Sequence, residues 1–202
     1  MDPDLHKKLA EQSYVIGNNW QAWIWNATIL RKAATLLEVY SSAGSNRFVD
    51  LVFKEPAPPP GETQTRNLTP DEVAALEDKE IWSVSMFLLA LAVECLVKAT
   101  LAKRDVKLVD ANGALLKKFQ IHDLDRLAKY ADLRISESDF RILAWLTQFS
   151  LWRGRYPIPK ESERLRQLAT MELGNWGEVT KRAFALYDRI AGLLSPGPVQ
   201  EA

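Results

Sequence analysis

The segment that most constrains the fold is the run from Thr69 to Arg104, which contains no glycine and, after Pro70, no proline. It opens with TPDE, in which Thr69 can cap a helix, Pro70 suits the first helical position and Glu72 completes a capping box. At its centre, residues 81–93 (IWSVSMFLLALAV) carry no charge. A bilayer core needs about 20 apolar residues, so this shorter run predicts a buried central helix and no membrane span.

Further helices are predicted on both sides of this central one from apolar spacing and from helix start and stop signals. The expected ranges are about 4–16 with a stop at Gly17, Trp20 to about Ala43, a short helix from near His122, Ser136 to Gly154, and Trp176 to Leu194. Four or five antiparallel helices of this kind make an all-α, up-and-down bundle.

The interval between the first two long helices breaks the helical pattern. RFVDLVF, residues 47–53, alternates as a short strand or an extended segment does, and the prolines of PAPPPG favour polyproline geometry. We therefore expect one globular domain with four parts. These are N-terminal helices (1–43), an extended proline-rich excursion (44–68), a helical core (69–195) and a tail (196–202).

The helix expected from residue 20 onward is apolar on two sides. One side carries Trp20, Trp23, Ile24, Ala27, Leu30, Ala34 and Leu37, and the other carries Trp25, Ile29, Leu36 and Tyr40. A helix of this kind must be covered on both sides, either inside its own domain or by a partner chain. We expect a homodimer, with Trp25 and Ile29 as the contact residues.

Composition disfavours most enzyme classes. Lysine plus arginine and aspartate plus glutamate each total 26, so no global basic field attracts nucleic acid, and any electrostatic recognition must be local. One cysteine and two histidines do not make a usual zinc site, and the chain has no phosphate loop, dinucleotide fingerprint or nucleophile elbow. We expect no metal and no cofactor. The polar start MDPDLHKKLAEQ predicts no secretory signal and, with the single cysteine, favours a cytoplasmic protein.

The polar residues that stand out lie on the central helix and at the start of the next one. Glu94 and Lys98 are four residues apart, which favours an ion pair, and they share a stripe with apolar residues. They form either a structural pair at the edge of the core or a charged wall of a ligand site. His122 precedes DLDRL, where it either caps or docks the helix or belongs to a site.

The segment LWRGRYPIPK, residues 151–160, has a structural and a functional interpretation. Gly154 can end a helix and the prolines keep the chain extended, while cations suit a helix C-terminus. Arg153 and Arg155 can therefore reach back to helix carbonyls. Alternatively, an arginine grips a phosphate or carboxylate while Tyr156 offers a stacking surface.

Three stretches, SMFLLALAVECLVKATL, HDLDRLAKYA and RYP, resemble the HEPN domain family of helical nucleotide-binding modules. The resemblance covers about residues 70–195. It implies a helical bundle that is usually dimeric and often encoded in microbial toxin–antitoxin or defence systems. The matching positions are Glu94 and Lys98, then His122, Asp123 and Leu124, then Arg155, Tyr156 and Pro157.

One departure from the family separates the functional hypotheses. Ribonuclease members carry an arginine and a later histidine with four to six residues between them, and Leu115, Leu116 and Lys117 stand at those places before His122. We therefore expect a non-catalytic nucleotide- or RNA-binding and dimerisation module, whose cognate partner would be an antitoxin or a nucleotidyltransferase. The alternatives are a metal-independent ribonuclease that uses His122 with Arg153 or Arg155, and a purely structural interaction domain.

Overall fold

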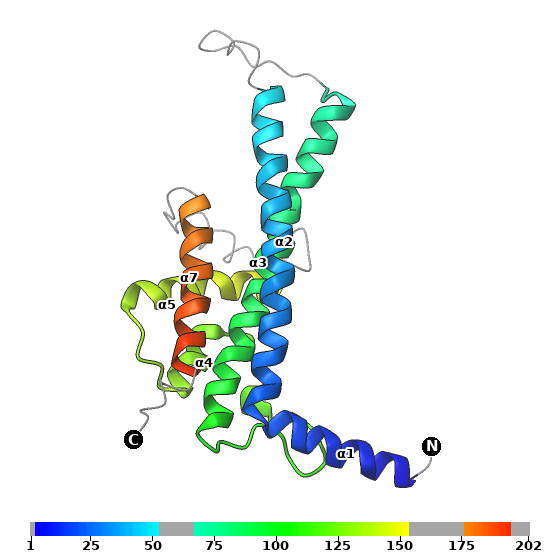
Figure 1. Ribbon diagram of the computed structural model, residues 1–202, viewed down its shortest axis with the longest axis vertical. Helices are drawn as coiled ribbons and strands as arrows, with labels where there is room; N and C mark the ends of the chain where they lie inside the picture. The colour runs from blue at the N-terminus through cyan, green and yellow to red at the C-terminus, as the bar shows by residue number, and fades with distance from the viewer. Residues whose placement is uncertain (1–2, 53–66, 154–175, 195–202) are drawn as a thin grey trace, which may run out of the picture.

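The structure is a computed structural model that describes residues 3–52, 67–153 and 176–194. These residues form six α-helices and no sheet (Figure 1). The helices are α1 (Pro3–Asn18), α2 (Trp20–Val52), α3 (Pro70–Lys103), α4 (Leu124–Tyr130), α5 (Glu137–Gln148) and α7 (Trp176–Leu194). A 3-10 turn, η1 (Lys117–Phe119), precedes α4, and a π-helical turn, η2 (Phe149–Arg153), extends α5. The all-α class is therefore confirmed for this part of the chain.

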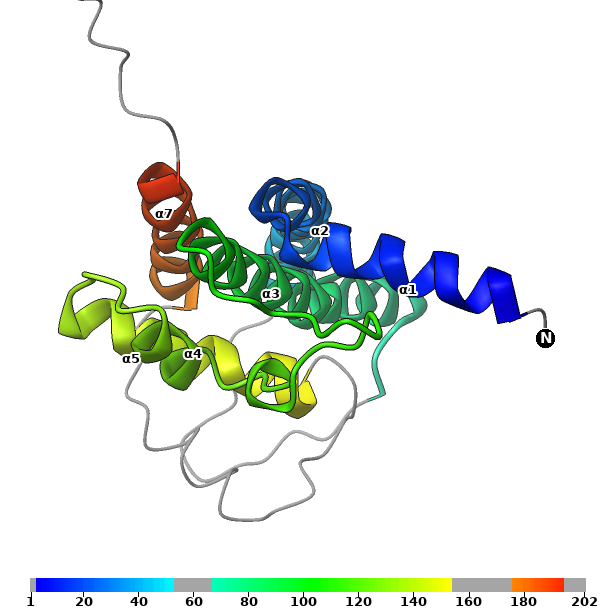
Figure 2. The same cartoon turned by 90° about the horizontal axis from the view of Figure 1, so that it is seen from below.

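The central helix begins and ends where the sequence predicts. Thr69 caps α3 through the amide of Glu72 at 3.3 Å, and the Glu72 carboxylate accepts from the Thr69 amide at 2.7 Å. Most residues from Ser85 to Ala102 are buried. In Figure 2, α2 lies on one side of α3, whereas α4 and α5 lie on the opposite side. By length and composition α3 is the one described helix that could cross a membrane, and 72% of its most apolar window is buried by the rest of the protein.

The expected break after residue 43 and the strand expected at 47–53 are wrong, because α2 continues as a helix to Val52. Packing explains the difference. Gly44 lies so close to α3 that an added Cβ would stand 2.5 Å from the Asp78 Cβ, so this glycine permits close helix contact instead of ending the helix. Lys79 reaches back to α2, with its Nζ 5.4 Å from the Phe48 ring centroid, and its carbonyl accepts from Ser41.

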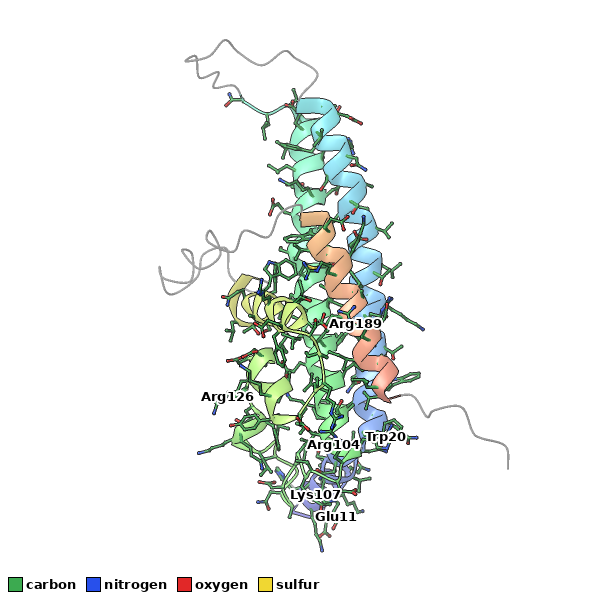
Figure 3. All side chains as sticks on the ribbon, turned by 90° about the vertical axis from the view of Figure 1, so that its left-hand side faces the viewer. Glu11, Trp20, Arg104, Lys107, Arg126 and Arg189 are labelled. Atoms are coloured by element: carbon green, nitrogen blue, oxygen red, sulfur yellow. The ribbon has the colours of Figure 1, made fainter. Side chains whose placement is uncertain are left out.

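The face of α3 opposite α2 is covered through large aromatic contacts. The rings of Trp82, Trp145 and Phe149 pack at centroid distances of 4.8 to 6.0 Å. The side chains of Trp145 and Phe149 are fully buried. On the outside of the same layer, Arg189 of α7, labelled in Figure 3, pairs with Asp139 of α5.

The first helix leaves the bundle at a steep angle and projects beyond it (Figures 1 and 2). It is attached mainly at its C-terminal end. Asn18 donates to the carbonyls of Tyr14 and Val109 and accepts from the amides of Leu108 and Val109 at 2.7 and 3.1 Å. Gly17 packs directly on the Val109 side chain, where a Cβ would lie 2.2 Å from Cγ2. The helix ends one residue after this predicted stop, at Asn18.

Candidate functional site

The predicted ion pair on α3 is formed, and it lies inside the protein. Lys98 Nζ is 2.6 Å from Glu94 Oε1, and the two side chains are only 4% and 8% exposed. The Lys98 ammonium also lies 5.3 Å from the ring centroid of Trp23 on α2. Because both charges are enclosed, this pair belongs to the structural interpretation and does not form an exposed wall of a ligand site.

His122 completes this group from the loop before α4. Its Nδ1 lies 2.8 Å from Glu94 Oε2, so the Glu94 carboxylate binds Lys98 through one oxygen and His122 through the other. An ionised carboxylate only accepts hydrogen bonds, so Nδ1 carries the proton in this contact. Among the described residues no hydrogen bond involves Nε2 of His122, and 39% of the side chain is exposed. His122 is thus held through Nδ1 by a buried carboxylate, while part of its side chain is exposed.

His122 does not cap α4, which is a correction to one interpretation of the sequence. Asp123 occupies the N-cap position and accepts from the amide of Arg126 at 3.0 Å. Its contact with Glu94 instead docks the start of α4 on α3, which agrees with the other half of that structural interpretation.

Two hydrogen bonds join the start of α4 to the end of α5. Ser150 Oγ of η2 lies 3.0 Å from the carbonyl oxygen of His122 and donates to it. The amide of Leu124 donates to Thr147 Oγ1, also at 3.0 Å. The turn that leads into the RGRYP segment is therefore anchored at His122.

The structure thus brings together Glu94, Lys98 and His122. Arg153, of which only the backbone is described, follows Ser150 by three residues, and Ser150 is bonded to the His122 carbonyl. The side chain of Arg153 and the whole of Gly154, Arg155 and Tyr156 lie outside the described residues. Ser150 was missed by the sequence interpretation. Its signal is a hydroxyl residue three positions after Thr147, on the buried side of a helix that is otherwise apolar there.

Cys95, next to Glu94, is not a candidate nucleophile. Burial, and after it the Glu94 charge, raises the pKa of its thiol from 9.0 to about 11, against a lowering by Lys98. A thiol with so high a pKa is protonated at neutral pH, and the thiolate is the reactive form. No group of three His, Cys, Asp or Glu side chains in the described residues could hold a metal ion.

The predicted dimer-contact residues are on the surface of the single chain. Trp25 is 69% exposed and Ile29 is 50% exposed, on the side of α2 that faces away from α3. Cover for this side does not come from the described part of the same chain.

Comparison of the chain with models of protein families, with curated proteins and with solved structures gives no match.

Proposed function

We propose that this protein is a HEPN-like up-and-down helical bundle that binds the phosphate of a nucleotide or RNA next to His122 and assembles as a homodimer in the cytoplasm. The observation that carries the binding proposal is the 2.8 Å contact between His122 Nδ1 and the buried Glu94 carboxylate. This contact fixes the ring, and Nε2 points away from the anchor.

The proposed division of roles follows from burial. Glu94 and Lys98 are enclosed and bonded to each other, so they position His122 and do not touch ligand. His122 is partly exposed, and its Nε2 donates to a phosphate oxygen when the ring carries both protons. Arg155 adds a guanidinium fork and Tyr156 a stacking surface for a base.

The position of η2 supports this assignment of Arg155 and Tyr156. Ser150 is bonded to the His122 carbonyl, and Arg155 follows Ser150 by five residues. Even a fully extended chain advances no more than about 3.6 Å per residue, so Arg155 stays within about 18 Å of this anchor.

Ribonuclease activity is the second candidate, and the same contact favours it. A histidine held by a carboxylate through Nδ1 has Nε2 available as a general base, as in other carboxylate–imidazole pairs. The missing arginine-to-histidine spacing argues against it. Incubation with mixed single-stranded RNA, with and without divalent metal, separates the two, since the binding proposal expects uncut RNA and cleavage abolished by His122→Ala supports the ribonuclease.

Titration of the protein with AMP and with a short 5′-phosphorylated RNA tests the proposal. Removal of one charge-assisted contact costs about 1.5–3 kcal/mol, so His122→Ala and Arg155→Ala should each weaken binding roughly tenfold to a hundredfold. His6→Ala is the matched control, because His6 is the other histidine and lies exposed on α1, and it should bind like wild type.

A melting curve for each variant distinguishes the purely structural alternative. That alternative expects Arg155→Ala to lower the melting temperature by several degrees and expects neither probe to bind wild type. Binding that survives both His122→Ala and Arg155→Ala overturns the proposed site.

A further inference from the structure

Trp23, in the first turn of α2, lies beside the buried charges that hold His122. Its ring centroid is 5.3 Å from Lys98 Nζ, and its Nε1 donates to the Gly17 carbonyl at 2.8 Å. Gly17 belongs to the last turn of α1. The indole is therefore held along its N–H edge by the end of α1, while its ring lies next to the Lys98 ammonium.

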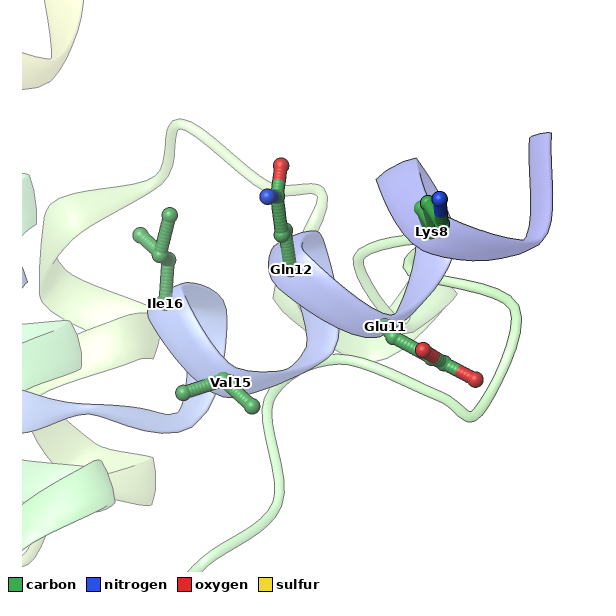
Figure 4. Close-up of a pocket in the computed structure, with 5 residues that line it drawn as sticks. All are labelled: Lys8, Glu11, Gln12, Val15 and Ile16. Atoms are coloured by element: carbon green, nitrogen blue, oxygen red, sulfur yellow. The ribbon is translucent and has the colours of Figure 1, made fainter. Parts of the chain in front are cut away.

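The part of α1 that precedes Gly17 does not extend this group of contacts. Figure 4 shows Lys8, Glu11, Gln12, Val15 and Ile16, which line a pocket of about 350 Å³. All five residues come from α1 itself, so this pocket brings no other element toward the Glu94 group. Gly17 is where α1 meets Trp23.

The Lys98 ammonium depends on the ring of Trp23. It has three N–H donors, and among the described residues its one hydrogen-bond acceptor is Glu94 Oε1, at 2.6 Å. Only 4% of the Lys98 side chain is exposed, so water has little access to the remaining donors. The face of an aromatic ring attracts a desolvated cation, and tryptophan does so most strongly. Trp23 thus supplies the second favourable contact of an enclosed charge.

The Glu94 carboxylate connects Lys98 to His122. The terminal torsion of a glutamate side chain is broad, so a carboxylate without a partner has no single preferred orientation. In this protein Lys98 holds Oε1, and His122 Nδ1 lies 2.8 Å from Oε2. Because a carboxylate is planar, the bond to Oε1 also restricts where Oε2 lies. The contacts therefore run without a gap from α2, through α3, to the loop before α4.

We propose that Trp23 is a positioning residue for the phosphate site, and that it sets the orientation of the His122 ring through Lys98 and Glu94. The inference rests on the proposed function, in which Nε2 of this ring donates to a phosphate oxygen. Orientation matters there because a hydrogen bond weakens steeply when its donor is misaligned. Trp23 therefore affects affinity without touching the phosphate.

Trp20, three residues earlier on α2, makes the same kind of contact but is not connected to Glu94 through it. Its ring centroid lies 5.2 Å from Nζ of Lys103 on α3. Lys103 is exposed and donates to the Leu194 carbonyl at 2.9 Å. Trp20, labelled in Figure 3, is thus a matched control, because its loss also removes an indole from a lysine of α3.

Long-range ¹H–¹⁵N spectra of the histidine rings, recorded without ligand, test the inference. Trp23→Leu removes the ring beside Lys98 and should shift the ring-nitrogen resonances of His122. Trp23→Phe keeps an aromatic face there and should restore most of the wild-type positions. Trp20→Leu should leave them in place. An unshifted His122 in Trp23→Leu, or an equal shift in Trp20→Leu, overturns the inference.

The wild-type protein provides a second test, which holds even where Trp23→Leu does not fold. Coupling between two sites is reciprocal, so AMP bound next to His122 should shift the indole Nε1–H resonance of Trp23. Trp23→Phe identifies this resonance, because it removes the indole. The resonance of Trp20 should stay in place. A Trp23 resonance that bound AMP leaves unmoved, or equal shifts of both indoles, overturns the inference.

Titration with AMP tests whether Trp23 acts through His122. Trp23→Leu should weaken binding roughly two- to thirtyfold, the range expected for a residue that acts on a site through its neighbours. In a His122→Ala background the same change should add no further loss, because residues that act through one contact are not additive. An additive loss overturns the inference. Failure of wild type to bind AMP contradicts the proposed function instead, and the ligand-free spectra still decide the role of Trp23.

Discussion

In most proteins charged side chains are exposed and large apolar side chains are buried. The surroundings of Glu94 and the outer face of α1 and α2 depart from this rule in opposite ways. Inside, two charged side chains are buried, and both are paired. Outside, large apolar side chains are exposed, and the described chain supplies no cover. Buried charges that are fully paired contribute to one defined arrangement, whereas exposed apolar stripes are typical of interaction surfaces. The first region accounts for the proposed site, and the second for the proposed dimer.

The largest expected effect comes from breaking the buried pair. Glu94→Ala leaves the Lys98 ammonium enclosed without its counter-charge, which should cost about 3–5 kcal/mol of unfolding free energy. Chemical denaturation measures this loss. The double variant Glu94→Leu with Lys98→Met should recover most of it, because an apolar pair of similar volume needs no counter-charge. A single variant as stable as wild type would contradict the importance given to this pair.

Alanine substitution of one buried and one exposed leucine compares the stability contributions of the two regions. Leu89 on α3 is fully buried, so Leu89→Ala should destabilise the fold by about 2–5 kcal/mol. Leu36→Ala, on the outer stripe, should change the stability of the monomer by no more than about 0.5 kcal/mol. Denaturation at concentrations low enough to dissociate a dimer makes the comparison. Similar losses at both positions would place Leu36 inside the fold.

A smaller effect is expected where the end of α5 is joined to His122. Ser150→Ala removes the donor to the His122 carbonyl, which should cost about 1 kcal/mol of stability. It should also weaken AMP binding, because the turn that carries Arg153 and Arg155 loses its anchor. A Ser150→Ala protein with reduced stability and unchanged affinity would separate this anchor from the site.

The effect expected at the buried thiol beside Glu94 appears only at alkaline pH. Because the pKa of Cys95 is raised from 9.0 to about 11, the folded protein keeps this proton at a pH where the unfolded chain loses it. Its contribution to stability is complete below pH 9 and is lost as the pH rises toward 11. Unfolding free energies of wild type and Cys95→Ala, compared across this range, should diverge in that direction. An equal decline in both proteins would contradict burial of the thiol.

Local signals in the sequence predicted part of this structure. The capping box at Thr69 and Glu72, the four-residue spacing of Glu94 and Lys98, and the ends of α7 all depend on near neighbours. The extension of α2 to Val52 depends instead on Gly44 packing against α3, which local spacing does not encode. Because local spacing does not show this contact, the sequence suggested that the helix ends near Ala43.

The candidate site also depends on contacts between residues far apart in the sequence, which local patterns do not predict. His122 and Glu94 are 28 residues apart, and their contact depends on how α4 packs against α3. Ser150 is equally far from His122, and a hydroxyl in an apolar helix face does not identify its partner. Residue types suggested which groups matter, but only the fold distinguishes the enclosed Glu94 and Lys98 from the accessible His122.

The most direct test of the central claim is long-range ¹H–¹⁵N NMR of the two histidine rings during titration with AMP. The account predicts that neutral His122 carries its proton on Nδ1, toward Glu94, and that AMP shifts the Nε2 resonance of His122 while His6 stays unchanged. A proton on Nε2 in neutral His122, or an Nε2 resonance that AMP leaves unmoved at saturating concentration, would contradict it.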